Sequence, residues 1–323
     1  MQVNISQNKE VAKISEQEFQ RISKNISRQI TKLKVNGKPI NIETHYSWSL
    51  PELKECWKKS FNESIECWKK SFNESIGEED LSIFAKTIVL RKWAAEQYLK
   101  NEKDLDLSVW IVKTWGGIRT GKDENLKKSI KEAFDIQKAK TGKFKFERIA
   151  SWSKPLAFKN YATRAIYDMR VIYSLNWLLL KGEAKIFFPM SSGRNSLLNF
   201  LPFENLLYIK AIGHNELIEE FQNDITSRQN GAGRSHLVNK LSSRVFIDKE
   251  DAYEIYCNLL IDIARKIYGA NDPVGLTKIE MTLFTIADTI IVGEVLERLQ
   301  AADHMAKKSA TLTCPTLQNH CHC

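Results

Sequence analysis

The sequence predicts a mainly α-helical protein. Apolar residues recur at helical spacing along most of the 323 residues, and no convincing run of alternating strand residues is present. With only 7 Pro and 14 Gly, the chain offers little material for long disordered linkers. An apolar content of 43% is enough to build a substantial core.

The N-terminal part begins with a helix expected over 10–33. Its apolar face is formed by Val11, Ile14, Phe19, Ile22, Ile26 and Ile30. Short strands can form within 34–44, because Asn36-Gly37 followed by Lys38-Pro39 is typical turn chemistry. Two further helices are expected over 51–76 and 79–100.

The remainder of the chain is also expected to be helical. A helix over 123–138 begins with Asp123 as its N-cap, and a helix over 162–181 stops at Gly182. Three more helices are expected over 214–228, 249–268 and 276–300.

A perfect tandem repeat lies inside the second expected helix. The segment ECWKKSFNESI at 55–65 is followed at once by an identical copy at 66–76. Eleven residues make about three helical turns, so the duplication keeps the apolar face in phase. We assign no function to it.

Three regions are expected along the chain. They are an N-terminal helical region over 1–104, a catalytic helical region over 105–302, and a detached tail over 303–323. The tail ends in Cys-His-Cys, but adjacent ligands without an upstream pair do not predict a metal site. We expect neither a metal nor a cofactor.

The sequence favours a cytoplasmic protein. No window of about 18 uninterrupted apolar residues predicts a membrane span, and the polar N-terminus does not resemble a secretory signal. The six cysteines have neither a disulfide-like framework nor the spacing of a four-cysteine iron–sulfur cluster. We also expect a monomer.

Positive charge is concentrated in the middle of the chain. The net charge is +9, and residues 101–170 hold 16 Lys and Arg against 9 Asp and Glu. Residues 201–300 hold 10 Lys and Arg against 15 Asp and Glu. A polyanion such as DNA would be attracted to the central region first, although a solvated lysine-rich surface gives the same pattern.

The central region also carries the residues with the most suggestive chemistry. Lys154 is expected at a helix–turn–helix junction, and Asp168 lies 14 positions later among apolar residues. Aromatic residues alternate there with basic and small polar ones.

These residues resemble the helix–hairpin–helix DNA glycosylases, in particular the 8-oxoguanine-glycosylase-like branch. The first helix of the motif matches 149–152, and Ser153-Lys154 matches the start of the second helix. The aspartate element matches Ile166-Tyr167-Asp168-Met169-Arg170-Val171. The hairpin reads Ser151-Trp152-Ser153 where the family has Gly-x-Gly, and Pro155 follows the lysine.

The resemblance implies catalytic roles for Asp168 and Lys154. Asp168 would stabilise the positive charge that develops on the sugar, or deprotonate a nucleophile. Lys154 would attack C1′ and form a Schiff base. Two mechanisms stay open: attack by Lys154, or attack by a water that Asp168 activates alone.

Further residues would bind the DNA or the extruded base. The candidates are Trp115, Gly116, Gly117, Trp152, Ser153, Tyr167, Arg170, Phe188, Ser192, Arg194 and Asn195. Simpler interpretations compete with these roles. Asp168 could be a helix cap, Lys154 a surface lysine, and Trp115 and Trp152 core residues.

The implied partner is double-stranded DNA that contains a modified base. We favour an antiphage glycosylase that removes glucosylated hydroxymethylcytosine over an 8-oxoguanine repair enzyme. A non-catalytic DNA-binding protein or a toxin–antitoxin partner remains the alternative outside enzymes. A tyrosine recombinase is disfavoured, because the nearest His-x-x-Arg match, His236-Leu-Val-Asn239, lacks the arginine.

Overall fold

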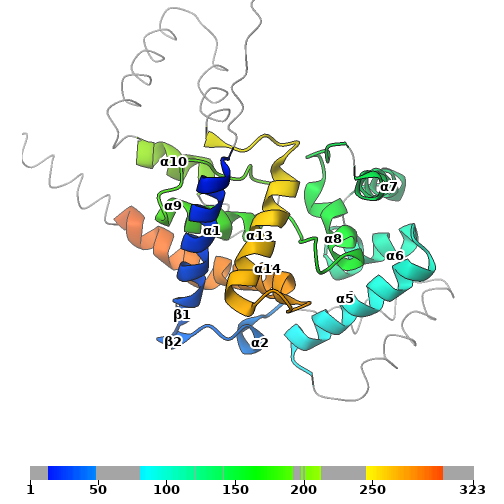
Figure 1. Ribbon diagram of the computed structural model, residues 1–323, viewed down its shortest axis with the longest axis horizontal. Coiled ribbons are helices and arrows are strands. Elements are labelled where there is room, and N and C mark those ends of the chain that lie inside the picture. Colours follow the sequence, from blue (N-terminus) through cyan, green and yellow to red (C-terminus); the bar gives the residue numbers. More distant parts are fainter. Residues whose placement is uncertain are drawn as a thin grey trace, which may run out of the picture.

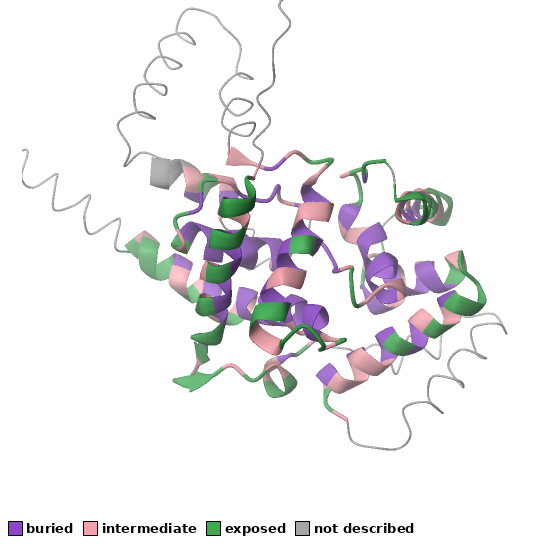
Figure 2. Ribbon diagram, in the orientation of Figure 1, coloured by how far each residue is buried: buried purple, intermediate pink, exposed green. Residues whose placement is uncertain are grey.

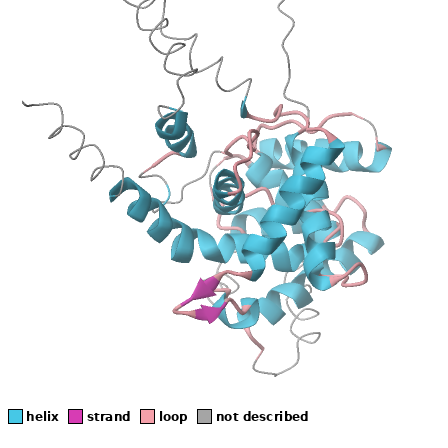
Figure 3. Ribbon diagram, turned by 60° about the vertical axis from the view of Figure 1, so that its left-hand side comes forward, coloured by secondary structure: helices cyan, strands magenta, loops and turns pink. Residues whose placement is uncertain are grey.

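The computed structural model describes residues 14–48, 81–119, 121–140, 142–191, 198, 201–211 and 245–300, and it confirms a mainly α-helical protein (Figures 1 and 3). The helices are α1 (Glu16–Thr31), α2 (Ile42–His45), α5 (Ile83–Lys100), α6 (Leu105–Trp110), α7 (Asp123–Ala139), α8 (Ile149–Lys159), α9 (Met169–Lys181), α10 (Phe203–Ala211), α13 (Ala252–Tyr268) and α14 (Gly275–Ile286). Two π-helical turns, η1 (Ile111–Trp115) and η3 (Ala287–Ile291), continue α6 and α14.

The first helix and the strand pair follow the sequence prediction. Ser15 caps α1 by accepting a hydrogen bond from the amide of Glu18, and the apolar face of the helix is buried. Strands β1 (Lys34–Val35) and β2 (Lys38–Pro39) pair antiparallel. Asn36 and Gly37 join them with φ of 52° and 76°, the left-handed conformations that a tight two-residue hairpin needs.

Two helix starts differ from the prediction. Asp123 is the first residue of α7 and not its N-cap, since Lys122 takes the cap position without a side-chain hydrogen bond. The helix expected from 162 begins only at Met169, because residues 160–168 are held in an irregular path by tertiary hydrogen bonds. Its end at Gly182 is confirmed.

The expected helix break at Ser153-Lys154 is wrong. Helix α8 runs through both residues, and the described residues that precede it, 142–148, are not helical and end at Arg148 in the left-handed conformation. Pro155 removes one backbone donor inside the helix. Every residue from 152 to 158 is buried, however, so packing outweighs that loss.

Most of the helices share one large hydrophobic core, and a small second cluster is formed by Tyr46, Phe84 and Met281 (Figure 2). Helix α13 packs between α1 and α14, and α14 also packs on α9; α8 packs on α5, α7 and η1. Residues before and after 104 contribute to this same core, so the expected boundary at 104/105 does not separate two cores. No helix in the described part of the chain could cross a membrane.

Some sequence predictions fall outside the described residues. They are the repeat over 55–76, the helix over 214–228 and the tail over 303–323.

Candidate active site

The structure brings Lys154 and Asp168 together. The Nζ atom of Lys154 lies 3.9 Å from Oδ2 of Asp168 and donates a hydrogen bond of 2.6 Å to the carbonyl oxygen of Ala150, one turn earlier in α8. The lysine side chain is only 6% exposed, whereas the aspartate side chain is 29% exposed. Lys154 is therefore not a surface lysine, and the carboxylate is the more accessible member of the pair.

Burial changes the acid–base behaviour of Lys154. Removal of the ammonium group from water lowers the pKa of Lys154 below its ordinary value of 10.5, although the negative charges of Asp168 and Glu280 partly oppose that shift. A larger share of Lys154 is therefore neutral near pH 7 than of an exposed lysine. A neutral amine is the form that acts as a nucleophile.

Asp168 has two roles in the structure. It is the N-cap of α9, where Oδ1 accepts a hydrogen bond of 3.0 Å from the amide of Arg170. The capping interpretation is thus correct, but it uses only one carboxylate oxygen. The other oxygen faces Lys154. The cap fixes the carboxylate, and the positive end of the α9 dipole stabilises its charge.

Gly116 makes room for the side chain of Lys154. It follows the π-helical turn η1, a distortion that occurs frequently at functional sites. A Cβ atom at Gly116 would lie 2.7 Å from Cδ and 2.8 Å from Cε of Lys154, and 2.8 Å from the carbonyl oxygen of Val112. The neighbouring Gly117 has φ of +66° and open space around it.

We therefore expect Gly116→Ala to displace Lys154. The variant should lose about 1–3 kcal/mol of stability through overpacking, and any activity that needs Lys154 should fall further than the loss of folded protein explains. Thermal unfolding and an activity assay together test this. Gly269→Ala is the matched control, because Gly269 has φ of +86° and open space, so its cost is backbone strain alone. Equal activity of the two variants would contradict a role for Gly116 in placing the lysine.

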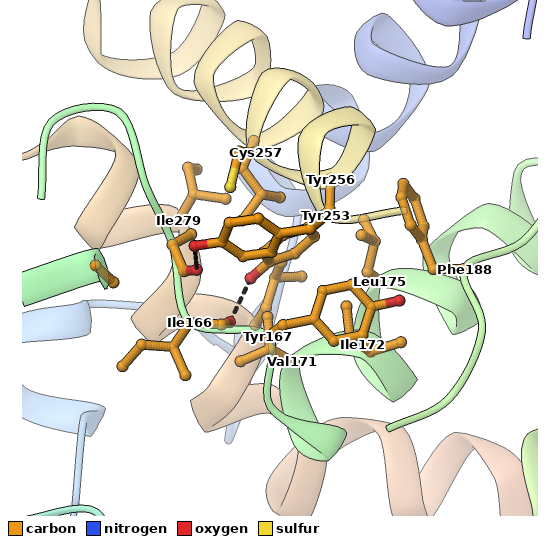
Figure 4. Packing of buried hydrophobic residues seen from close by; sticks show 14 of the residues in the cluster. Ile166, Tyr167, Val171, Ile172, Leu175, Phe188, Tyr253, Tyr256, Cys257 and Ile279 are labelled. Atoms are coloured by element: carbon orange, nitrogen blue, oxygen red, sulfur yellow. Dashed lines mark hydrogen bonds between the residues drawn. The ribbon is translucent and has the colours of Figure 1, made fainter. Parts of the chain in front are cut away.

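The segment before Asp168 is anchored from α13 (Figure 4). The hydroxyl of Tyr253 donates to the carbonyl oxygen of Ala165 over 3.1 Å, and the hydroxyl of Tyr256 donates to that of Ile166 over 2.7 Å. Burial raises the pKa of both phenols well above their usual value, so both keep the protons that they donate. These bonds hold the irregular chain in place just before Asp168.

The same segment is anchored from α8. The amide of Tyr167 donates to Oγ of Ser153 over 3.1 Å, and the hydroxyl of Tyr167 donates to the carbonyl oxygen of Pro189 over 2.7 Å. Ser153 precedes Lys154, so this bond ties the lysine helix directly to the residue before Asp168. Ser153 and Tyr167 are buried and serve this connection, which argues against the expected contact with DNA.

The guanidinium of Arg170 does not pair with Asp168. It lies 3.3 Å from Asp288, which belongs to η3, and 4.7 Å from the ring centre of Phe284. Its side chain stays partly exposed. The π-helical turn η3 therefore also contributes to the surroundings of Asp168, because its Asp288 binds Arg170, two residues after Asp168.

The aromatic residues expected to hold a base are core residues. Trp115, Trp152, Tyr167 and Phe188 are all buried. Trp115 packs edge-on against Phe158, and Trp152 stacks on Phe144 and donates its indole N–H to backbone carbonyls. In this conformation none of the four side chains is exposed for stacking on an extruded base. Ser192, Arg194 and Asn195 lie outside the described residues.

The sequence interpretation missed two buried charges. Glu280 interrupts the apolar run of α14, and Arg91 interrupts that of α5. Their side chains form an ion pair in the core. The sequence did contain a sign of this pair: each charge lies inside an otherwise apolar helix, and a buried charge requires a partner.

Searches with the chain against protein-family models, curated proteins and solved structures found no match. The observations that bear on function are therefore the geometry of Lys154 and Asp168 and the positive charge of residues 101–170.

Proposed function

We propose that this protein is a DNA glycosylase that excises a modified base from double-stranded DNA. The observation that carries the proposal is the buried amine of Lys154 lying 3.9 Å from the carboxylate of Asp168. An amine with a lowered pKa beside a carboxylate fixed at a helix start is suited to attack on a sugar carbon. The charge of the central region suits a DNA substrate.

The reaction follows from these two groups. The base leaves C1′ with the electrons of the glycosidic bond, and the carboxylate of Asp168 stabilises the positive charge on the sugar. The Lys154 nitrogen forms a bond to C1′ and gives up a proton to the carboxylate of Asp168, 3.9 Å away, which is basic enough to take it, unlike the nearer carbonyl oxygen of Ala150. Opening of the sugar ring yields a Schiff base, and its hydrolysis returns the amine and leaves an abasic site.

In this proposal α7 and α8 form the helix pair of a helix–hairpin–helix motif, and residues 142–148 belong to the hairpin between them. This segment carries Lys143, Lys145 and Arg148, all exposed. Lys143 and Lys145 also make surface ion pairs, with Asp251 and Glu132. Such pairs are weak and can exchange for phosphate contacts.

The proposed substrate is phage DNA with glucosylated hydroxymethylcytosine, and 8-oxoguanine DNA is the second candidate. The sequence favoured the former because of an altered hairpin at Ser151-Trp152-Ser153, but α8 runs through these residues, so that reason no longer applies. The proximity of Lys154 and Asp168, the two residues that the resemblance makes catalytic, favours the latter. In either case the enzyme would act as a cytoplasmic monomer without a cofactor. The burial of the aromatic candidates favours a non-catalytic DNA-binding protein as the alternative.

The decisive experiment incubates the folded protein with three DNAs: unmodified, 8-oxoguanine-containing and glucosylated phage DNA. We expect free base and abasic sites from one modified DNA and neither from unmodified DNA. DNA binding without base release from any of the three would favour the non-catalytic alternative.

We also expect DNA affinity to fall steeply with salt. Neutralisation of phosphates by the basic central region releases counterions, so the affinity should drop by orders of magnitude between about 50 and 200 mM salt. Lys128→Gln, an exposed change on α7, should weaken binding and reduce the salt slope by about one. Lys24→Gln, an exposed change on α1, is the control and should do neither. A flat salt dependence would contradict the proposed contact region.

A further inference from the structure

A buried ion pair lies behind the candidate active site. Arg91 of α5 holds Glu280 of α14 with both of its terminal nitrogens: Nη1 is 3.1 Å from Oε2, and Nη2 is 2.5 Å from Oε1. Nη1 also donates to the hydroxyl of Thr277 over 3.2 Å. The two charged side chains are only 2% and 6% exposed. Desolvation makes such a pair a poor source of stability, which points to a role other than stabilising the core.

The carboxylate of Glu280 also holds the main chain that leads to Asp168. Its Oε2 atom accepts a hydrogen bond of 2.8 Å from the amide of Ile166, two residues before Asp168. The carbonyl oxygen of Ile166 is bound by Tyr256 on the other side. Among the described residues, Glu280 is thus the one charged side chain that accepts a hydrogen bond from a backbone amide of this segment. A charge-assisted bond is stronger and shorter than a neutral one.

Glu280 also acts electrostatically on Lys154. Among the described residues, the charges that act on the lysine amine come from Asp168 and Glu280, and both favour its protonated form. Arg91 is the counter-charge of Glu280. The Tyr46 phenol near these groups stays neutral, because burial and the negative charge of Glu280 raise its pKa.

We propose that Glu280, fixed by Arg91, is a positioning residue of the active site: its carboxylate anchors the backbone that presents Asp168 to Lys154. This inference rests on the proposed glycosylase function for its effect on excision. Its effect on Lys154 itself does not depend on DNA. The supporting ion pair joins α5, which carries Arg91, to α14, which carries Glu280. The reacting groups lie on α8 and at the start of α9.

The test replaces Glu280 in two ways. Glu280→Gln removes the carboxylate charge but leaves Arg91 buried without its counter-charge, which can prevent folding. The double variant Arg91→Met/Glu280→Met removes both charges together and also the oxygen that accepts from the Ile166 amide, so the segment that presents Asp168 loses its anchor. In folded Glu280→Gln the loss of a negative charge should lower the pKa of Lys154 further, and in the folded double variant the displacement of the Asp168 carboxylate should do the same. Lys154 should therefore lose its proton at a lower pH than in the wild-type protein.

The measurement is an NMR titration of protein labelled with ¹⁵N-lysine, in which the Lys154 signal is assigned by its absence from Lys154→Met. Excision by the same proteins is measured as a function of pH. We expect both the Lys154 titration and the alkaline rise of excision to move to lower pH, with DNA affinity unchanged. Glu254→Gln is the matched control. It removes a carboxylate of α13 and breaks its 2.7 Å ion pair with Arg164, but its charge does not act on Lys154, so it should move neither.

A Lys154 titration at the wild-type pH in the folded double variant would overturn the proposal. So would an unchanged pH profile of excision by folded Glu280→Gln. Because the titration needs no DNA, it decides the role of Glu280 even if the wild-type protein releases no base, a result that would count against the proposed function alone.

Discussion

Asp168→Asn should abolish base excision, with a loss of about 100-fold or more, while DNA affinity stays the same or rises slightly. The carboxylate is the group placed to stabilise charge on the sugar and to take a proton from Lys154, and such contributions are typically worth about 10²–10⁴ in rate. Loss of a negative charge cannot weaken attraction to phosphate. Excision kinetics and a binding titration on the same DNA measure both effects.

Asparagine is the informative replacement because it preserves the structure. It caps helices about as well as aspartate does, so the bond from the Arg170 amide to position 168 should persist and α9 should keep its start. Asp104→Asn is a matched control: Asp104 caps α6 through the Leu107 amide in the same way. Only the change at 168 should stop excision. Full excision by folded Asp168→Asn would reject the catalytic assignment.

The parts of the fold that the sequence predicted correctly depend on local patterns. The apolar face of α1, the Asn36-Gly37 turn and the end of α9 at Gly182 each follow from residues that are neighbours in the chain. Periodicity and turn chemistry report such features directly. The resemblance supplied Lys154 and Asp168 as catalytic residues, and the structure places their charged groups 3.9 Å apart, although no pairing between them was predicted.

The errors arise where tertiary contacts outweigh local preferences. The resemblance placed a helix start at Ser153-Lys154, yet packing on α5, α7 and η1 keeps α8 continuous through both residues and through Pro155. Residues 162–168 have helical periodicity, but hydrogen bonds from α8, α13 and α14 hold residues 165–167 in an irregular, non-helical path. These partners lie up to 114 positions away in the chain, so no local pattern contains them.

The orientation of the aromatic side chains was equally hidden. An aromatic residue among basic ones can stack on a base or fill a core, and the composition of the segment is the same in both cases. The structure shows that Trp115 and Trp152 fill the core. Glu280 was overlooked for a related reason, since its importance depends on Arg91, which lies 189 positions away in the chain.

The Lys154→Met variant should eliminate a covalent adduct that borohydride traps in the wild-type protein. Attack by the Lys154 amine on C1′ produces a Schiff base, and hydride reduces its C=N bond to a stable secondary amine. Methionine keeps an unbranched chain beside Gly116 but has no amine. The adduct is detected as protein-linked DNA on a denaturing gel.

The pH dependence of trapping should follow Lys154. The amine attacks in its neutral form, so trapping should increase with pH until the pKa of Lys154 is passed. Burial places that pKa below the 10.5 of a free lysine, so the rise should be complete at a lower pH than an exposed lysine would require. For Asp168→Asn, which should not release the base, trapping is measured on DNA that already carries an abasic site. There the rise should move to still lower pH than in the wild-type protein, because a charge that favours the ammonium form is gone.

Lys159→Met is the control for a general effect of lysine removal. Lys159 lies on the same helix, and burial also lowers its pKa, but it pairs with Glu102 and not with Asp168. This variant should still be trapped. If the wild-type protein forms no adduct and Lys154→Met excises at the wild-type rate, the reaction does not use the amine. Asp168 would then act alone by activating a water, and the buried lysine would serve only to balance its charge.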